Sequence, residues 1–180
     1  MTKRSSKFKR MKHDAYFTPP EAVVPLLPHL GDVTGYAEPC YGEGHLEIAL
    51  DLYINDPLLP CRWGSDISID ECDATSFNYL AEWATDHLGP ISHFITNPPW
   101  TREILHPIIE NLSRQLPTWL LLDADWMHTK QAIPYMANCE KVVSIGRVSW
   151  MQNGVSGFDN CCWYLFDKTA CQTEFYARVA

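Results

Sequence analysis

Residues 93–100 read His93-Phe94-Ile95-Thr96-Asn97-Pro98-Pro99-Trp100, an apolar run that stops at Asn-Pro-Pro. A short apolar run bounded by turn residues is typical of a buried strand. Each proline fixes its own φ and pushes the residue before it out of the helical region. The sequence therefore predicts a buried strand whose carboxyl end is a rigid, extended loop.

This loop offers hydrogen-bond acceptors without donors, because proline has no N–H. The side-chain oxygen of Asn97 and the carbonyl of Pro98 could accept the two hydrogens of an amino group, whose nitrogen lone pair would stay free to attack an electrophile. Trp100 could stack on the flat ring that carries the amine. Asn97, Pro98, Pro99 and Trp100 are therefore candidate catalytic residues, and the alternative is a Pro-Pro turn with a half-buried Trp.

A second motif, Glu38-Pro39-Cys40-Tyr41-Gly42-Glu43-Gly44, lies between a predicted strand at 34–37 and a predicted helix at 46–53. Two close glycines between a strand and a helix let a ligand approach backbone N–H groups and the positive end of the helix. The three-glycine spacing of dinucleotide sites is missing. The acid and the glycine pair favour a ligand with an ammonium and a carboxylate, and an ordinary strand-to-helix turn is the alternative.

Acidic residues also follow the next predicted strand, at 61–67. Asp66 ends this strand, where a carboxylate can accept hydrogen bonds from a ribose diol. Asp73-Ala74 comes too soon afterwards for a full crossover helix.

The remaining elements are predicted from apolar spacing and turn residues. They are a short irregular helix at 21–30, helices at 77–88 and 104–112, a strand at 118–123 buried on both faces, a weak helix at 127–137, and a hairpin of strands 141–150 and 161–167 that closes the sheet.

Length and composition predict one domain without a metal. The chain has 180 residues, of which 46% are hydrophobic. No run of about 20 apolar residues exists, and the Lys/Arg/Ser-rich start has no apolar core, so we expect no membrane span, no signal peptide and a cytoplasmic location. The seven cysteines and seven histidines are scattered, which predicts reduced thiols rather than a metal site.

The charge is distributed unevenly. The net charge is −8, yet the first twelve positions carry no acid and six basic residues, namely Lys3, Arg4, Lys7, Lys9, Arg10 and Lys12. We predict that residues 1–14 form a flexible arm that binds nucleic-acid phosphates by counterion release. A passive solvated tail is the alternative. Residues 15–180 are then the single domain.

The order of these motifs resembles the small, phage-type amino-methyltransferases that use S-adenosylmethionine, in particular the DNA adenine-N6 family. The resemblance extends from Tyr16-Phe17-Thr18-Pro19 to the strand at 163–167. It implies an α/β fold: a doubly wound, mostly parallel, Rossmann-like sheet of seven strands with an antiparallel C-terminal hairpin.

The resemblance also implies roles for particular residues toward the cofactor S-adenosylmethionine. Carried over by position, Phe17 and Thr18 would close over the cofactor. Glu38, Gly42 and Gly44 would contact its methionine part, Asp66 its ribose, and Asp73 with Ala74 its adenine. Pro39 and Ile67 would also contact the cofactor. Asn97 would border the cofactor and, with Pro98, Pro99 and Trp100, hold the target amine.

The implied reaction is direct transfer of the methyl group to the N6 amine of adenine in DNA, on a flipped or unpaired base. Alternatives are an RNA adenine methyltransferase, a glutamine-N5 methyltransferase of release-factor type, and a non-catalytic binding module. Cytosine-N4 methylation is disfavoured, because that group tends to have Ser in place of Asn97.

The chain has no separate target-recognition domain, so the arm, the 151–160 loop, a second copy or a partner subunit would supply recognition. A phage-encoded protein would act in the cytoplasm of its bacterial host.

Overall fold

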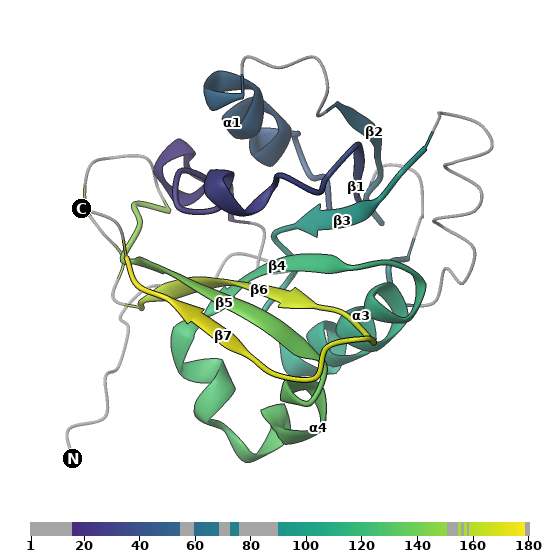
Figure 1. Cartoon of the computed structure of the whole chain (residues 1–180). Helices are drawn as coiled ribbons and strands as arrows, with labels where there is room; N and C mark the ends of the chain where they lie inside the picture. The colour runs from purple at the N-terminus through teal and green to yellow at the C-terminus, as the bar shows by residue number, and fades with distance from the viewer. Residues whose placement is uncertain are drawn as a thin grey trace.

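The computed structural model describes residues 16–54, 60–68, 73–75, 90–150, 155, 157 and 159–178. In chain order its elements are η2 Pro20–Ala22, η3 Leu27–His29, β1 Tyr36–Glu38, α1 His45–Tyr53, β2 Cys61–Gly64, β3 His93–Thr96, α3 Arg102–Gln115, β4 Thr118–Asp123, η4 Ala124–His128, η5 Lys130–Ala132, α4 Ile133–Met136, β5 Cys139–Gly146, β6 Cys161–Phe166 and β7 Glu174–Tyr176 (Figure 1).

Seven strands form one mixed sheet in the order β2-β1-β3-β4-β6-β5-β7 (Figure 1). The first four are parallel to one another. Strand β6 is antiparallel to both β4 and β5, and β7 is parallel to β5. The predicted seven-stranded, mostly parallel α/β sheet with an antiparallel C-terminal pair is therefore confirmed.

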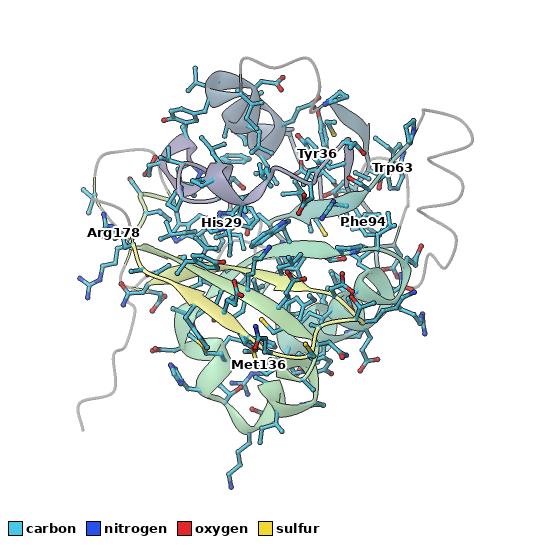
Figure 2. The ribbon with its side chains drawn as sticks, in the orientation of Figure 1. His29, Tyr36, Trp63, Phe94, Met136 and Arg178 are labelled. Atoms are coloured by element: carbon cyan, nitrogen blue, oxygen red, sulfur yellow. The ribbon has the colours of Figure 1, made fainter. Side chains whose placement is uncertain are left out.

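Both faces of the sheet are covered. Alternate residues of a strand point to opposite faces, and in β4 Trp119 and Leu121 pack with α1 and η2, while Leu120 and Leu122 pack with α3. In the same way, Tyr36 of β1 and Phe94 of β3 belong to the hydrophobic clusters on opposite faces of the sheet (Figure 2). This two-sided burial explains why β4 is apolar at successive positions, and it confirms the doubly wound architecture.

The parallel strands bring the motifs to one edge of the sheet. Strands β1, β2, β3 and β4 run in the same direction, so the loops after them leave at the same edge. Glu38, Asp66, Asn97 and Asp123 lie at these strand ends or in the loops that follow. Ligands of such sheets bind at this carboxyl edge.

The predicted helix at 21–30 is wrong, because two 3₁₀ turns, η2 and η3, stand in its place. Pro25 and Pro28 lack the N–H that an α-helix requires inside its hydrogen-bond ladder. The backbone bonds that do form span three residues, as from the Leu26 N–H to the Val23 carbonyl at 2.9 Å. The weak helix predicted at 127–137 is likewise broken into η4, η5 and the four-residue α4.

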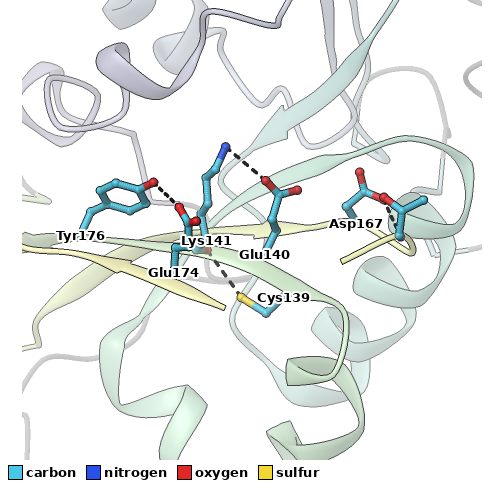
Figure 3. Close-up of polar contacts among 7 residues, drawn as sticks. Cys139, Glu140, Lys141, Asp167, Glu174 and Tyr176 are labelled. Carbon is cyan, nitrogen blue, oxygen red and sulfur yellow. Dashed lines mark hydrogen bonds and ion pairs between the residues drawn. The ribbon is translucent and has the colours of Figure 1, made fainter. Parts of the chain in front are cut away.

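The predicted hairpin exists, but it does not close the sheet, because β7 pairs outside β5. Strand β7 was not predicted, because it is short and exposed, with Phe175 65% accessible, and therefore lacks the apolar alternation of a buried strand. Its contacts include a 2.5 Å hydrogen bond from the Tyr176 hydroxyl to Glu174, beside the Lys141–Glu140 ion pair of β5 (Figure 3). The ring of His29 packs edge-on against Tyr176 at 4.3 Å.

Several predictions lie outside the described residues. They are the basic arm at 1–14 with its six Lys and Arg side chains, the helix at 77–88 and most of the 151–160 loop. In the part of the chain that the structure describes, every helix is too short or too polar to cross a bilayer.

Candidate active site at the carboxyl edge of the sheet

A hollow of about 650 Å³ lies at the carboxyl ends of β1, β2 and β3, within the size range of small-molecule sites. Most of the predicted site residues line it: Phe17, Thr18, Glu38, Pro39, Gly42, Asp66, Ile67, Asp73, Ala74, Asn97 and Pro99. Gly44, Pro98 and Trp100 are not among its lining residues. The fold thus gathers motifs from separate stretches of sequence around one space.

The glycine loop is shaped by Tyr41, which the sequence analysis did not single out. Gly42 and Gly44 have positive φ values of 55° and 76°, a conformation that glycine adopts at low cost. A Cβ atom at Gly44 would lie 2.6 Å from the Tyr41 hydroxyl oxygen, and one at Gly64 would lie 2.2 Å from the Tyr41 ring. Gly44 therefore makes room for Tyr41, and the ring holds the loop against the end of β2.

Glu38 is a buried carboxylate with an open acceptor position. Its side chain is only 2% exposed, and its Oε2 has no hydrogen-bond partner among the described residues. The pKa of Glu38 is raised well above its usual value. Burial is the main cause, and the nearby carboxylates of Glu47 and Asp66 add to it. A buried acceptor without a donor is costly, so a ligand that brings a cationic N–H group to this wall would be stabilised.

Asp66 joins the glycine loop to the end of β2. Its Oδ2 accepts the Gly42 N–H at 3.0 Å, and its Oδ1 accepts the Ser68 N–H at 2.8 Å. This carboxylate therefore shapes the wall of the hollow as well as lining it. The predicted contact with a ribose stays a prediction.

Asp73 and Ala74 are held in place by a tight turn and by a buried amide of α3. The Asp73 carboxylate accepts the Thr75 N–H at 2.9 Å, which closes the turn. Asn111, 2% exposed, donates from Nδ2 to the Ala74 carbonyl at 2.9 Å. The sequence signal for Asn111 is a polar residue inside the apolar stripe of the helix, next to Leu112.

Asn97 is tied to the N-terminal segment. Its Nδ2 donates to the Tyr16 carbonyl at 3.1 Å and to the Thr18 hydroxyl oxygen at 3.2 Å. A carboxamide has two donor hydrogens and one acceptor oxygen. Because Nδ2 faces these two acceptors, Oδ1 is the atom left to accept hydrogen bonds at the hollow.

The same segment covers part of the hollow. The ring of Phe17 stacks on His45 at the start of α1, with centroids 4.1 Å apart and planes 25° apart. His45 lines the hollow beside Phe17 and was missed in the sequence analysis.

Trp100 lies away from the first hollow and lines a second one of about 480 Å³. Its indole N–H donates to the Leu121 carbonyl of β4 at 2.9 Å, and its ring is perpendicular to that of Trp150 at 5.5 Å. Trp126 forms another wall of the second hollow, and Glu103 lines both hollows. The two spaces therefore adjoin next to the Asn-Pro-Pro-Trp loop, and stacking on Trp100 stays a prediction.

Within the described ranges, no group of three or more His, Cys, Asp or Glu side chains could hold a metal ion.

Comparison with known proteins supports the fold. No protein-family model and no curated protein matches the sequence. A solved structure from Listeria monocytogenes, provisionally assigned as a class I S-adenosylmethionine-dependent methyltransferase, superposes with a TM-score of 0.51 at 10% sequence identity. The match covers 89% of this chain and 64% of the Listeria protein. The chain therefore has the α/β fold of the class I methyltransferases and spans less than two thirds of that protein's length.

Proposed function

We propose that this protein transfers a methyl group from S-adenosylmethionine to the N6 amine of adenine in DNA. The observation that carries the proposal is the tethered carboxamide of Asn97, which leaves an acceptor oxygen at the wall of a cofactor-sized hollow. The fold, at the coarser level of a class I methyltransferase, agrees with it.

The first hollow suits the cofactor. Glu38 offers a carboxylate oxygen to an ammonium group, and charge-assisted hydrogen bonds of this kind are the strong ones. Asp66 and Asp73 supply further carboxylates around the same space, where they would accept from ribose hydroxyls and an adenine amine. These acids, and the absence of Lys and Arg from the described lining residues, disfavour a phosphate-bearing cofactor.

The second hollow suits the base that receives the methyl group. Stacking on an aromatic side chain stabilises a nucleobase by about 1–3 kcal/mol, and Trp100 and Trp126 both line this space. A base inside a duplex is unreachable, so it would flip out at a cost of a few kcal/mol. With the cofactor in the first hollow and the base in the second, the Asn-Pro-Pro-Trp loop would lie between the reactants.

The reaction needs positioning and charge stabilisation. The target amine donates its hydrogens to Asn97 Oδ1 and the Pro98 carbonyl, which aims its lone pair at the methyl carbon. Bound S-adenosylmethionine would supply the methyl group: the N–CH₃ bond would form as the S–CH₃ bond breaks, and the electron pair of the broken bond would stay on sulfur. The nitrogen becomes positive and then loses a proton to solvent, so the two acceptor oxygens stabilise the charge that develops in the transition state.

Recognition of DNA is assigned to the basic arm at 1–14, with a second copy or a partner subunit available to supply sequence specificity. Bacterial cytoplasm is the proposed location.

The test is to incubate the full-length protein with methyl-labelled S-adenosylmethionine and single-stranded DNA, duplex DNA, RNA or protein extract. Digestion of the DNA to nucleosides should give N6-methyladenine by mass spectrometry, with single strands at least as good as duplex. Methyl label only in N4-methylcytosine or only in protein would contradict the proposal. Label confined to RNA would replace DNA as the substrate.

A further inference from the structure

Thr18 contacts Asn97 across a separation of 79 residues in sequence. Its side chain is 4% exposed, and its hydroxyl oxygen lies 3.2 Å from Asn97 Nδ2. The Tyr16 carbonyl lies 3.1 Å from the same nitrogen. Two acceptors on one short segment thus occupy the donor side of the carboxamide.

This arrangement fixes which atom of the amide faces the hollow. A carbonyl oxygen can only accept, so rotation of the carboxamide by 180° would bring Oδ1 against the Tyr16 carbonyl, two acceptors without a hydrogen between them. The Thr18 hydroxyl can donate as well as accept, so the Tyr16 carbonyl selects the orientation and Thr18 adds a second hydrogen bond that resists rotation of the carboxamide. Without the Thr18 hydroxyl, a single hydrogen bond would hold a group that can rotate about its terminal torsion, where the rotamer preference is broad.

We propose that Thr18 is a positioning residue that holds the Asn97 carboxamide with Oδ1 directed at the amine to be methylated. This inference rests on the proposed function, and it gives Thr18 a role toward the acceptor substrate besides its predicted place beside the cofactor. The reaction depends on the orientation of Asn97, since a misplacement of about 1 Å in a reacting group can cost about 10²-fold in rate.

Two variants separate the hydroxyl from the volume of the side chain. Thr18→Val keeps the shape and removes the acceptor, and we expect kcat to fall about 10-fold or more while the cofactor Kd changes less than about 2-fold. Thr18→Ser keeps the hydroxyl and should retain kcat within about 3-fold. The matched control is Thr169→Val, which removes an exposed hydroxyl bonded to Asp167 in the turn after β6.

A second measurement needs no substrate and no activity. The side-chain NH₂ signals of Asn97, assigned by their loss in Asn97→Ala, should be protected from solvent exchange in the wild type and in Thr18→Ser, and less protected in Thr18→Val. Unchanged exchange in Thr18→Val would overturn the proposal, as would unchanged kcat. Equal losses in the Val and Ser variants with a lowered Tm would also overturn it, because they would indicate a structural role.

The two proposals can fail separately. A wild type that methylates nothing contradicts the proposed function, whereas the exchange measurement still reports whether Thr18 holds Asn97.

Discussion

Two side chains of the hollow, Glu38 and Asn97, show how a residue's chemistry depends on its partners. Both lie at the carboxyl ends of adjacent strands, β1 and β3. Asn97 has its donors satisfied and its acceptor open, and Glu38 has one carboxylate oxygen without a partner among the residues described. In the proposed function, these two oxygens would accept hydrogen bonds from N–H groups of the cofactor and of the target base.

Cofactor binding should release protons through Glu38. Its raised pKa keeps the carboxyl protonated to a higher pH than usual, whereas an ammonium group binds the ionised form. Affinity for S-adenosylmethionine should therefore rise with pH and level off above the raised pKa. Calorimetry in buffers of different ionisation enthalpy should detect the released protons. Glu38→Gln should abolish this proton release. Glu110→Gln, on the exposed face of α3, is the control and should leave the release unchanged.

The same shift has a consequence for stability. The pKa of Glu38 is higher in the folded protein than the unfolded value of 4.5. The contribution of this group to the free energy of unfolding is therefore fully present below pH 4.5. Its contribution is lost as pH rises toward the folded pKa. Urea unfolding of the free protein should show this decline, and Glu38→Gln should remove it; identical pH profiles for the two proteins would contradict the buried, high-pKa assignment.

Replacing Asn97 tests the acceptor oxygen. In Asn97→Ala, kcat should fall about 10²-fold or more, because the deleted acceptor acts mainly as charge develops on the amine. The cofactor Kd should barely change. Asn138→Ala, an exposed asparagine before β5, serves as control, and survival of turnover in Asn97→Ala would remove Asn97 from the mechanism.

At the scale of elements, the glycine loop joins β1, α1 and β2 through one aromatic residue. The Tyr41 N–H donates to the Ser65 carbonyl at 2.8 Å, and its hydroxyl donates to Glu47 of α1 at 2.5 Å. The ring lies against the backbone of Gly64. The loop is thus held by packing and hydrogen bonds to its neighbouring elements before any ligand binds.

Gly64→Ala should disturb this packing. The added Cβ would meet the Tyr41 ring at 2.2 Å, and overpacking of this kind costs about 1–3 kcal/mol. Urea unfolding and the cofactor Kd should both show the effect. Gly31→Ala is the matched control, because a Cβ there meets nothing within 4 Å. The double variant Gly64→Ala/Tyr41→Ala should lose less stability than the sum of the losses in the two single variants. Losses in the free energy of unfolding that are strictly additive would argue against contact between the two residues.

At the scale of the whole molecule, charge is separated along the chain. The net charge of −8 includes six basic residues within the first twelve, so the remainder is acidic and would repel phosphates. For the proposed function, we therefore expect phosphate contacts to be made mainly by the arm, where basic residues are concentrated.

Deletion of residues 1–12 should weaken DNA binding, because the arm carries the charges that displace counterions from the phosphates. The log–log slope of affinity against salt should become shallower by about 0.9 for each phosphate that the arm neutralises in the full-length protein. Cofactor affinity, measured by calorimetry, should stay unchanged and serves as the control. Equal salt slopes for the full-length and shortened proteins would make the arm a passive tail.

Local sequence patterns were enough to predict the buried strands, the helix of α3 and the order of the motifs, because apolar periodicity and the backbone limits of Pro and Gly act over a few residues. The parallel arrangement of the strands was implied by the family resemblance. The resemblance carried by the order of the motifs grouped Glu38, Asp66 and Asn97 around one cofactor, and the structure brings all three to one hollow. Three features could not be predicted from local patterns: β7 forms the edge of the sheet, Tyr41 fills the glycine loop, and Thr18 bonds to Asn97. These contacts join residues from separate elements, so they depend on how whole elements pack and not on any local pattern.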